Sequence, residues 1–491
     1  GYKLDHRRQY PEGTQYVYSN WTPRSCQYFP EAKDGAVVFG IQYFIKEYLM
    51  KQFQEDFFNK PKEIAVSEFR RRVDTFLGPN GVGTKHIEDL HDLGYLPIRI
   101  KALAEGTLCP IRVPALTFIN THPDFFWLTN YFETLISTTL WLPMTSATTA
   151  RLYKKELVRH AQLTGFGEDV NLDFLCHDFS MRGMAGVEAS IMSGMAHMTS
   201  FCGSETIPAI AALEEYYNAD ADKELIAATI PATEHSVMCA GGKEDELETF
   251  RRLITKVYPN GFVSIVSDTW DFWKVMSEYL PKLKEEILAR DGRLVIRPDS
   301  GNPVDIICGY PIKDLEELTF QEQSEAQAVG AYEMLWNIFG GTINEKGYKV
   351  LNPKVGLIYG DSITLERQKE IYKRLEEKGF AATNLVLGVG SFTYQFKSRD
   401  SLGFAMKATW CQVNGEEREI FKDPKTDEGT KKSLKGLICV QGDGDKYVAE
   451  DQVSKKQEEL GYLQTVFEDG KLVKEWSLKD IRGAVDRSIV L

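Results

Sequence analysis

Six apolar runs in the sequence end abruptly in Asp, His, Arg or Gly, and this repetition restricts the fold more than any other feature. The runs lie at 173–175, 225–230, 262–267, 294–296, 355–359 and 385–387. Most of them are followed by a stretch with the apolar spacing of a helix. Buried apolar strands that alternate with helices are typical of a parallel sheet covered on both faces. In such folds the loops at the carboxyl ends of the strands form the functional site.

The strand and helix series occupies residues 166–400, and the regions on either side differ from it in composition. A chain of 491 residues is too long for one compact core, so we expect a large α/β domain with flanking structure. Residues 1–165 are a mixed α+β region, in which apolar spacing predicts helices at 125–139 and 146–163. Residues 401–491 contain a polar basic loop, a β-hairpin and a short helix, and we expect them to complete the flanking domain.

Two local signals place the elements near the carboxyl end. Asp469-Gly470 suits the positive φ angles of a tight type I′ turn and predicts a hairpin over 462–476. Ser477, with Asp480 three residues later, predicts the capped start of a helix.

Composition and charge exclude several classes of protein. The formal net charge of -13 and the lack of a basic stripe argue against non-specific binding to nucleic acid or to a membrane surface. The eight cysteines are scattered without any Cys-x-x-Cys pair, so neither a zinc site nor a disulfide framework is indicated, and a reducing compartment fits. The sequence contains no signal segment and no apolar run long enough to cross a bilayer, so we expect a cytoplasmic protein.

Charged side chains follow three of the predicted strands. Arg297 and Asp299 flank Pro298 at the end of one strand, and because side chains alternate along an extended chain they should point to the same side. Asp268 and Asp361 follow two other strands. Carboxylates at equivalent strand ends are the arrangement expected where a Mg²⁺ ion and the hydroxyls of a sugar are bound. The alternatives are a structural ion pair and solvated loop acids.

Gly388-Val389-Gly390-Ser391 places two glycines at another strand end, where exposed backbone N–H groups can surround a phosphate. A tight strand-to-helix turn would give the same sequence. Cations clustered downstream in an acidic protein favour the phosphate interpretation: Arg399, Lys407, Lys422, Lys431, Lys432 and Lys435. A solvated lysine loop is the alternative for the last four.

Two further motifs carry residues suited to binding or catalysis. His235, preceded by Glu234, can serve as a general base, a metal ligand or a phosphoryl acceptor. Phe179 and Arg182 lie three residues apart in a strand-to-helix loop, so a flat aromatic ligand can stack on the ring while the guanidinium binds an anion. A core Phe and a helix-starting Arg are the alternatives there. We interpret His177 as a core or helix-surface histidine.

Several strings occur together in an order found in one known family. They are Tyr2-Lys3, His177-Asp178-Phe179, Arg182-Gly183, Pro231-Ala232, Glu234-His235-Ser236, Ser264, Ser267-Asp268, Arg297-Pro298-Asp299-Ser300-Gly301-Asn302-Pro303, Gly360-Asp361 and Phe421-Lys422-Asp423-Pro424. Together they closely resemble the nicotinamide phosphoribosyltransferases of the nicotinate phosphoribosyltransferase (type II phosphoribosyltransferase) family. The resemblance runs from Tyr2 to the carboxyl end. The seven-residue string that begins at Arg297 and the Glu-His-Ser string are specific, whereas the glycine loop is not.

The resemblance implies an α/β fold with an irregular, incomplete (β/α) barrel and a flanking mixed, β-rich domain. It implies a homodimer with two active sites at the subunit interface. The implied reaction transfers the 5-phosphoribosyl group from 5-phosphoribosyl 1-pyrophosphate to nicotinamide, giving nicotinamide mononucleotide and pyrophosphate in NAD salvage. Mg²⁺ is the implied cofactor. ATP is an implied co-substrate, whose hydrolysis is coupled to the transfer through a phosphohistidine.

The resemblance also implies roles for residues around the pyridine ring. Phe179 and Tyr2 of the partner subunit would stack on the two faces of nicotinamide. Arg297 and Ser264 would hold the carboxamide oxygen, and Glu205 would accept a hydrogen bond from the amide nitrogen.

The remaining implied roles concern the phosphoribosyl group, the polyphosphates and catalysis. Asp299 would lie near the metal and stabilise positive charge that develops at the anomeric carbon. His235 would be the phosphoryl acceptor, and Asp268 would orient it through a hydrogen bond. The other implied ligands of ribose, phosphate, pyrophosphate and ATP are Arg182, Gly360, Asp361, Gly390, Ser391, Arg24, Lys422 and Lys431, with Arg399 and Lys407 supplied by the partner chain.

Two positions depart from the family pattern. Glu205 stands where nicotinamide users have Asp, one methylene shorter, but a carboxylate there still accepts a hydrogen bond from an amide and repels nicotinate. Ser391 stands where a second adjacent glycine is usual, which restricts the approach of the backbone to a phosphate.

Three other functions are open to such a chain. One is a nicotinate-preferring homologue, against which the acid at Glu205 argues. Another is a binding or signalling protein that keeps the fold without turnover; loss of Asp299, His235 or Arg297 would favour it, and all three are present. A barrel glycosidase with paired carboxylates is the third, and it explains neither the glycine loop nor the histidine.

Overall fold

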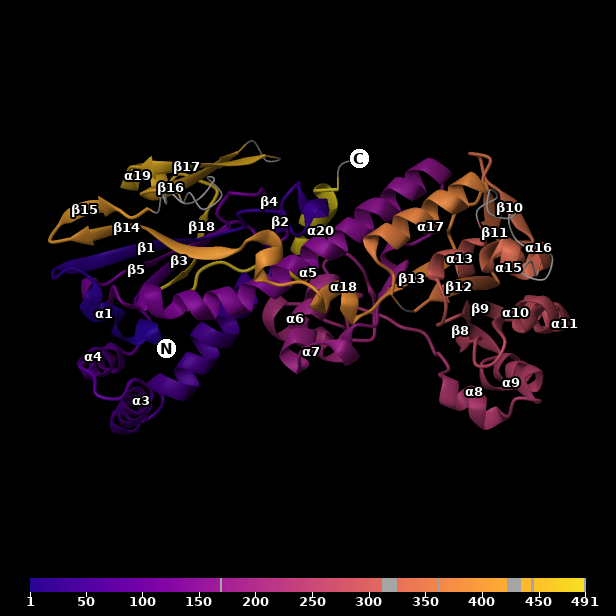
Figure 1. Ribbon diagram of the computed structural model, residues 1–491, viewed down its shortest axis with the longest axis horizontal. Coiled ribbons are helices and arrows are strands. Elements are labelled where there is room, and N and C mark those ends of the chain that lie inside the picture. The colour runs from indigo at the N-terminus through magenta and orange to yellow at the C-terminus, as the bar shows by residue number, and fades with distance from the viewer. Residues whose placement is uncertain (168–169, 311–324, 361, 422–433, 443–445, 490–491) are drawn as a thin grey trace. The chain divides into compact units, whose positions relative to one another are not determined.

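The computed structural model describes residues 1–491 apart from 168–169, 311–324, 361, 422–433, 443–445 and 490–491 (Figure 1). The chain forms two compact units. Unit 1 consists of Gly1–Thr149, Ala211–Asp222 and Lys397–Ser488, and unit 2 of Ala150–Ile210, Lys223–Phe396 and Ile489–Leu491. Unit 1 therefore combines segments from both ends of the chain, whereas unit 2 contains the series of parallel strands.

Unit 1 is built on a seven-stranded antiparallel sheet with the order β15-β14-β1-β5-β3-β18-β19. Its strands are β1 (Thr14–Thr22), β3 (Ile98–Ala102), β5 (Leu116–Asn120), β14 (Ala405–Val413), β15 (Glu416–Glu419), β18 (Gln464–Glu468) and β19 (Lys471–Leu472). Two smaller pairs join β2 (Ala36–Val37) to β4 (Leu108–Cys109) and β16 (Leu437–Gly442) to β17 (Tyr447–Val453). Because β1 pairs with β14, amino-terminal and carboxyl-terminal segments share one sheet (Figure 1).

Helices pack around this sheet and confirm some local predictions but not others. They are α1 (His6–Gln9), α2 (Ile41–Phe44), α3 (Lys62–Leu77), α4 (Lys85–Leu93), α19 (Lys455–Glu458) and α20 (Leu478–Arg487), with the first part of α5 (Leu128–Thr164) and the end of α7 (Ile207–Tyr217). The two helices predicted at 125–139 and 146–163 are one helix, α5, with Pro143 inside it. The helical character of both stretches is confirmed, and only the interval between them differs, because a buried helix can continue past a proline when tertiary packing compensates for the lost hydrogen bond.

The two carboxyl-terminal signals were correct. Asp469 and Gly470 both have positive φ, 48° and 78°, in the turn between β18 and β19. Ser477 caps α20: its side chain accepts a hydrogen bond from the backbone N–H of Asp480 over 3.1 Å.

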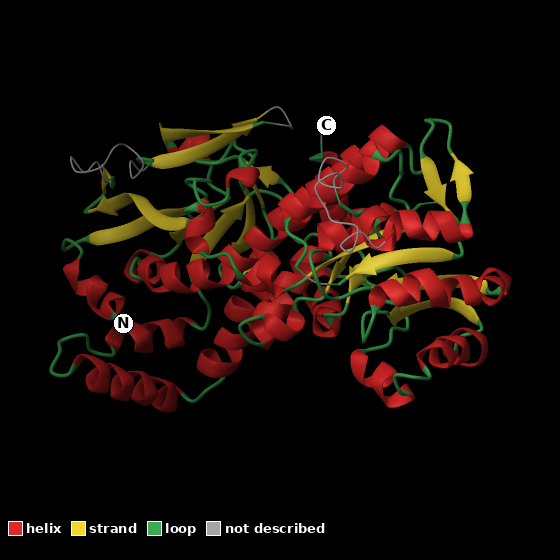
Figure 2. Ribbon diagram, turned by 45° about the vertical axis from the view of Figure 1, so that its right-hand side comes forward, coloured by secondary structure: helices red, strands yellow, loops and turns green. Residues whose placement is uncertain are grey.

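Unit 2 is built on a six-stranded sheet with the order β7-β6-β13-β12-β9-β8, in which every neighbouring pair is parallel. Its strands are β6 (Cys176–Asp178), β7 (Gly203–Ser204), β8 (Asn260–Val266), β9 (Asp291–Arg297), β12 (Val355–Tyr359) and β13 (Leu385–Val389), and a separate hairpin joins β10 (Gly341–Ile343) to β11 (Lys349–Leu351). Helices follow most of the strands (Figure 2): α6 (Val187–His197), α8 (His235–Gly241), α9 (Glu246–Arg252), α10 (Phe272–Lys274), α11 (Leu280–Lys282), α12 (Lys284–Ala289), α13 (Pro303–Cys308), α15 (Glu325–Val329), α16 (Ala331–Phe339), α17 (Leu365–Glu377) and α18 (Ser391–Gln395).

A short segment links the two edge strands of this sheet without forming a regular strand. Ala228 makes a parallel bridge to Gly203 of β7, and Ala232 makes one to Ser264 of β8. The strand predicted at 225–230 is therefore wrong. The parallel sheet curls into an irregular, incomplete barrel, and the chain also contains a separate β-rich unit, which confirms the predicted fold class. None of the described helices combines the length and the apolar character that a membrane span requires.

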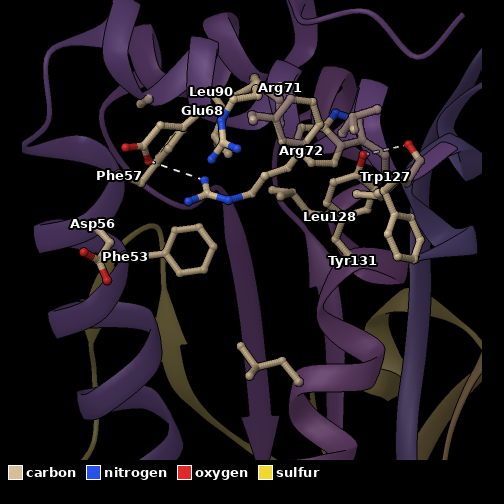
Figure 3. A pocket seen from close by; sticks show the side chains of 18 of the residues that line it. Phe53, Asp56, Phe57, Glu68, Arg71, Arg72, Leu90, Trp127, Leu128 and Tyr131 are labelled. Atoms are coloured by element: carbon tan, nitrogen blue, oxygen red, sulfur yellow. Dashed lines mark hydrogen bonds and ion pairs between the residues drawn. The ribbon is translucent and has the colours of Figure 1, made fainter. Parts of the chain in front are cut away.

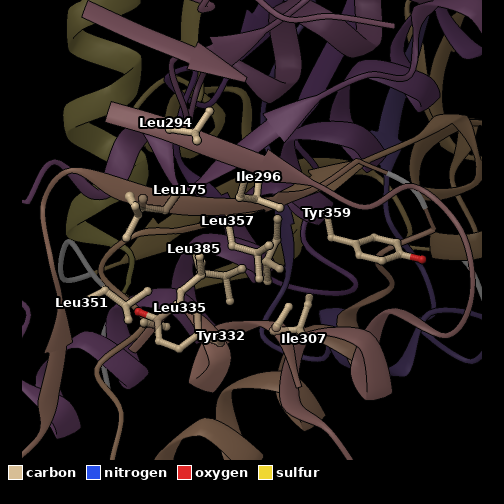
Figure 4. Packing of buried hydrophobic residues seen from close by; sticks show 14 of the residues in the cluster. Leu175, Leu294, Ile296, Ile307, Tyr332, Leu335, Leu351, Leu357, Tyr359 and Leu385 are labelled. Atoms are coloured by element: carbon tan, nitrogen blue, oxygen red, sulfur yellow. The ribbon is translucent and has the colours of Figure 1, made fainter. Parts of the chain in front are cut away.

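The two faces of the parallel sheet carry different side chains, because successive residues of a strand point to opposite sides. On one face Leu294 and Ile296 of β9, Leu357 of β12 and Leu385 of β13 are completely buried and pack with Leu335 of α16 in one apolar cluster (Figure 4). Burying each such side chain stabilises the fold by roughly 1.5–3 kcal/mol. The other face of these strands is consequently free to form a site.

Glu105 is a buried carboxyl group of unit 1, with 1% exposure. It accepts hydrogen bonds from the backbone N–H groups of Gly40 (3.1 Å) and Gln42 (2.6 Å) and from the hydroxyl of Tyr217 (3.0 Å). Burial raises its pKa to about 7, because desolvation outweighs these hydrogen bonds. This group therefore titrates near neutral pH.

Candidate active site

A cavity of about 830 Å³ is lined by side chains from β6, β8, β9, β12 and β13 and by the segment that links the sheet edges. On β9 its lining residues are Arg293, Val295 and Arg297, which alternate with the two residues packed in the apolar cluster. The cavity therefore occupies the inner face of the curled sheet. It brings together five of the residues predicted for the site: Phe179, Arg182, Glu205, Ser264 and Arg297.

Strand β6 and the residue after it supply one wall of the cavity. His177 and Phe179 both line it, and their ring centroids are 4.5 Å apart. Asp178, between them in the chain, is completely buried and accepts a hydrogen bond from Thr206 Oγ1 over 2.9 Å. The carbonyl of Asp178 also accepts the backbone N–H of Glu205 over 3.0 Å. These bonds fix the end of β6 against the segment that follows β7.

Glu205 places a carboxylate in the cavity wall. Its Oε1 lies 2.9 Å from Nε2 of His177 and accepts a hydrogen bond from the hydroxyl of Thr229. The hydrogen bond from His177 lowers the pKa of Glu205, and Thr229 acts in the same direction, while burial opposes them. Glu205 is therefore an ionised hydrogen-bond acceptor at neutral pH.

Two hydrogen-bond donors of the cavity wall, Ser264 Oγ and Arg297 Nε, have no partner among the described residues. Nη2 of Arg297 donates to the carbonyl of Thr233 over 2.8 Å, which holds the guanidinium in place. Burial lowers the pKa of Arg297, and the charges of Asp299 and Asp268 oppose this. A buried polar group without a partner costs about 1–3 kcal/mol. Both donors are therefore suited to an oxygen atom of a ligand.

Asp268, directly after β8, is the centre of a hydrogen-bond network, and its side chain is 5% exposed. Its Oδ1 is 3.2 Å from Nε2 of His235, the first residue of α8. Its Oδ2 accepts the backbone N–H of Asp299 over 2.9 Å and the hydroxyl of Ser300 over 2.5 Å. One carboxylate thus holds both the histidine and the loop that carries Asp299.

Two glycines leave the space that the Phe179 ring occupies. A Cβ at Gly388 would lie 2.8 Å from Cα of Gly360 and 2.9 Å from Cδ2 of Phe179. A Cβ at Gly360 would lie 3.3 Å from Oδ1 of Asp299 and 4.0 Å from Cδ of Arg297. Arg297 at the end of β9, Asp299 just beyond it and Phe179 directly after β6 therefore approach the same stretch of backbone.

The glycine loop lies against the loop after β6. A Cβ at Gly183 would collide with the side chain of Ser391, and Gln395 Oε1 accepts the backbone N–H of Ala185 over 2.8 Å. The structure thus brings Gly390 and Ser391 beside the loop that carries Arg182.

Four of the predicted site residues that the structure describes lie in unit 1. Tyr2 is 74% exposed, and Lys407 on β14 lies opposite Asn20 on β1. Nε of Arg24 donates to the carbonyl of Gly403 over 2.9 Å. Burial lowers the pKa of Arg24, and the charge of Arg399 acts in the same direction. Asp361, Lys422 and Lys431 lie outside the described residues.

Asp299 is the residue that the sequence analysis placed near a metal ion. Among the residues that the structure describes, no group of three or more His, Cys, Asp or Glu side chains is placed to hold one. Mg²⁺ is commonly bound by one or two carboxylates together with substrate phosphates. The residues present therefore fit a metal ion that is bound jointly with a polyphosphate.

A second cavity, of about 870 Å³, lies within unit 1 (Figure 3). Its wall includes several aromatic side chains, among them Phe53, Phe57 and Trp127. Nη1 of Arg72 lies 3.4 Å from Oε2 of Glu68 in the same wall. The residues that line this cavity include none of those predicted for the site.

Three residues of the site had no role in the sequence analysis. His177 is buried, as its interpretation as a core histidine predicted, but it also lines the cavity and is hydrogen-bonded to Glu205. Its position two residues before Phe179 was the available signal, because alternate residues of a strand face the same side. Thr229 and Thr233 lie in the irregular linking segment, where no periodicity indicates the direction of a side chain.

The fold and the site together define the class of this protein: an α/β enzyme whose site is built at the carboxyl ends of a curled parallel sheet. Residues 174–471 match the model of the Nicotinate phosphoribosyltransferase (NAPRTase) family, and residues 1–100 match that of the Nicotinamide phosphoribosyltransferase N-terminal domain. The chain belongs to the nicotinate phosphoribosyltransferase family and is a phosphoribosyltransferase. The resemblance seen in the sequence is thereby confirmed.

Individual relatives agree with this assignment. The chain is 52% identical over 490 residues to a Nicotinamide phosphoribosyltransferase of Acinetobacter baylyi, covering 98% of this chain and 95% of the relative. The crystal structure of nicotinate-nucleotide pyrophosphorylase from Pyrococcus furiosus is similar with a TM-score of 0.55 at 13% identity, covering 99% of this chain and 91% of that one. Human Nicotinic Acid Phosphoribosyltransferase is similar with a TM-score of 0.51 at 15% identity, covering 99% and 92%. The two structures establish a shared fold.

Proposed function

We propose that this chain transfers the 5-phosphoribosyl group of 5-phosphoribosyl 1-pyrophosphate to nicotinamide, giving nicotinamide mononucleotide and pyrophosphate in NAD salvage. The reaction requires Mg²⁺ and is coupled to ATP hydrolysis through a phosphohistidine. Family membership and the name of the Acinetobacter relative support the reaction class. The hydrogen-bonding groups of the cavity wall, described next, support nicotinamide as the base that receives the phosphoribosyl group.

The observation that carries the proposal is the match between the cavity wall and a carboxamide. Ser264 Oγ and Arg297 Nε are donors without partners, and Glu205 is an ionised acceptor in the same wall. The two donors bind the carboxamide oxygen, and Glu205 accepts a hydrogen bond from the amide nitrogen. Phe179 stacks on one face of the pyridine ring. Nicotinate would place a second carboxylate beside Glu205, and the repulsion favours the amide.

The chemistry at the ribose needs positioning and charge stabilisation more than activation of a nucleophile. The pyridine nitrogen attacks the anomeric carbon as the bond to pyrophosphate breaks, and Asp299 stabilises the positive charge that develops on the sugar. Asp299, Gly360 and Asp361 bind the ribose, and Gly390 and Ser391 bind the 5-phosphate. The pyrophosphate and ATP phosphates are bound by cations: Arg182, Arg24, Lys422 and Lys431, with Arg399 and Lys407 of the partner subunit.

Mg²⁺ would be held by Asp299 together with substrate phosphate oxygens, and would supply Lewis-acid neutralisation of the leaving pyrophosphate. The homodimer follows from the same assignment, because Tyr2 of the partner subunit completes the stack on the ring. Its side chain is 74% exposed, which fits a residue that serves a neighbouring subunit.

His235 is suited to the role of phosphoryl acceptor. Its side chain is 48% exposed, and its Nε2 faces Asp268 Oδ1 over 3.2 Å. A hydrogen bond donated from Nε2 leaves the lone pair on Nδ1. Nδ1 attacks the γ-phosphorus of ATP, the bond to ADP breaks, and water later hydrolyses the phosphohistidine. Asp268 stabilises the positive imidazole ring in this step.

The test is mononucleotide formation from 5-phosphoribosyl 1-pyrophosphate and Mg²⁺, with nicotinamide and nicotinate in parallel, each with and without ATP. We expect preferential product from nicotinamide and stimulation by ATP. Asp299→Ala should abolish transfer, whereas Asp291→Ala, at the exposed opposite end of the same strand, should not. A preference for nicotinate would refute the substrate assignment, and no product from either base would support a binding protein instead.

A further inference from the structure

His177 is held in one orientation by three neighbours. Its Nε2 is 2.9 Å from Oε1 of Glu205, and its ring centroid is 4.5 Å from that of Phe179. On the other side, Nδ1 lies so close to Gly203 that a Cβ there would be 2.7 Å away. The side chain is 10% exposed. A rotated imidazole would lose its bond to Glu205, so the donor is fixed before any ligand binds.

The hydrogen bonds to Glu205 use only one of its two carboxylate oxygens. Among the described residues, His177 and Thr229 both contact Oε1, and none donates to Oε2. A carboxylate can accept several hydrogen bonds, so Oε2 remains available for a ligand. The protein therefore anchors the side chain through one oxygen and leaves the other for the cavity.

The charge balance of the cavity makes this anchoring important. Its charged lining residues are the cations Arg182, Arg293 and Arg297 and the anions Glu205 and Glu234. The three guanidinium groups attract a ligand that carries a carboxylate, such as nicotinate. Glu205 opposes that attraction only while its own carboxyl group is ionised. A Glu205 that took up a proton could instead donate a hydrogen bond to nicotinate.

We propose that His177 is a specificity-determining positioning residue: by donating to Oε1 it keeps Glu205 ionised and oriented, and so favours nicotinamide over nicotinate. This inference rests on the proposed function. The direction of the pKa shift at Glu205 agrees with it, because His177 is its largest cause. Thr229 supports the same oxygen, and its loss should have a smaller effect in the same direction.

The experiment compares the ratio of kcat/KM for nicotinamide to that for nicotinate. His177→Phe keeps a ring beside Phe179 but removes the donor, whereas His177→Gln keeps an N–H donor. We expect the ratio to fall about tenfold or more in His177→Phe and to stay within about threefold of the wild type in His177→Gln. His122→Phe is the control for replacing a histidine elsewhere, because His122 lies in unit 1 and does not line the cavity.

A double-mutant cycle separates an action through Glu205 from a general structural effect. In a Glu205→Gln background, His177→Phe should change the ratio by less than about twofold, since no carboxylate remains to be held. The inference is overturned if the ratio in His177→Phe stays within about twofold of the wild type, or if the same fall appears without Glu205. Thr229→Val, expected to lower the ratio about threefold, provides a second variant should His177→Phe fold poorly.

The experiment distinguishes failure of the proposed function from failure of the role of His177. A wild-type enzyme that forms no mononucleotide from either base overturns both the function and this inference, whereas an active wild type with an unchanged ratio in the variants overturns only the role of His177.

Discussion

Asp268→Asn tests whether one carboxylate serves both the histidine and the ribose-binding loop. The native side chain faces three donors: Nε2 of His235, the backbone N–H of Asp299 and the hydroxyl of Ser300. An Asn side chain has one oxygen and an NH₂ group, so one side of this network meets a donor instead of an acceptor. A hydrogen bond to a charged group is worth roughly 1.5–3 kcal/mol, which corresponds to a rate factor of about 10 to 150.

The assay for this prediction is the rate of mononucleotide formation without ATP. His235→Ala should remove the stimulation by ATP and leave a slower ATP-independent reaction, because it does not touch the loop of Asp299. Asp268→Asn should lose the stimulation and also lower the ATP-independent rate about tenfold or more. Ser300→Ala, which removes only one of the three bonds, should lower it by a few-fold at most. Equal ATP-independent rates in Asp268→Asn and His235→Ala would refute the shared role of the carboxylate.

Three further variants test packing, titration and ligand binding. Gly388→Ala should destabilise the fold by about 1–3 kcal/mol and raise the KM for nicotinamide, because the added Cβ displaces Phe179. Gly483→Ala should have neither effect, because Gly483 lies in a helix where a Cβ would meet only the end of a long side chain. Thermal denaturation measures the first effect and steady-state kinetics the second. Glu105→Gln should flatten the pH dependence of stability. Because the pKa of Glu105 in the folded protein, about 7, exceeds its ordinary value of 4.5, this group contributes up to about 3 kcal/mol of stability below pH 4.5, and that contribution is lost as the pH rises through 7. Melting temperatures of wild type and variant across this pH range measure the difference. Ser264→Ala should not lower the melting temperature, because its hydroxyl has no partner among the described residues, and should raise the KM for nicotinamide about fivefold; an unchanged KM would exclude the hydroxyl as a ligand donor.

The sequence predicted the parts of unit 2 whose geometry is periodic. Strand β9 and its neighbours appeared as apolar runs, and the parallel order places their carboxyl ends along one edge, where Asp268, Arg297 and Gly360 lie. What apolar runs do not reveal is that only one face of these strands is packed. Arg293, a charged residue directly before the apolar run of β9, was a visible sign of a cavity on the inner face. The distances between site residues on different strands depend on how strongly the sheet curls, and no local sequence pattern predicts that curvature.

Helix α5 and the linking segment show the limits of local signals. Pro143 lowers the helical propensity of its surroundings, but most of the residues that follow it in the same helix are buried, and their packing outweighs that local preference. The run at 225–230 has the composition of a strand, yet it meets its neighbours only at single bridges. In both places tertiary contacts decide the structure.

The irregular segment that links the edges of the parallel sheet orients two residues of the cavity wall, Arg297 and Glu205. In a regular strand the backbone carbonyls are used by the neighbouring strands, and side chains alternate strictly between the two faces. Here the N–H of Thr233 pairs with Ser264 over 3.0 Å while its carbonyl accepts Nη2 of Arg297, and Thr229 turns its hydroxyl to Glu205. The same segment thus anchors both Arg297 and Glu205, the residues that we propose bind the carboxamide oxygen and the amide nitrogen. A fully regular closing strand would engage that carbonyl in the ladder and leave Arg297 without its anchor, so the gap in the sheet is a requirement of the site.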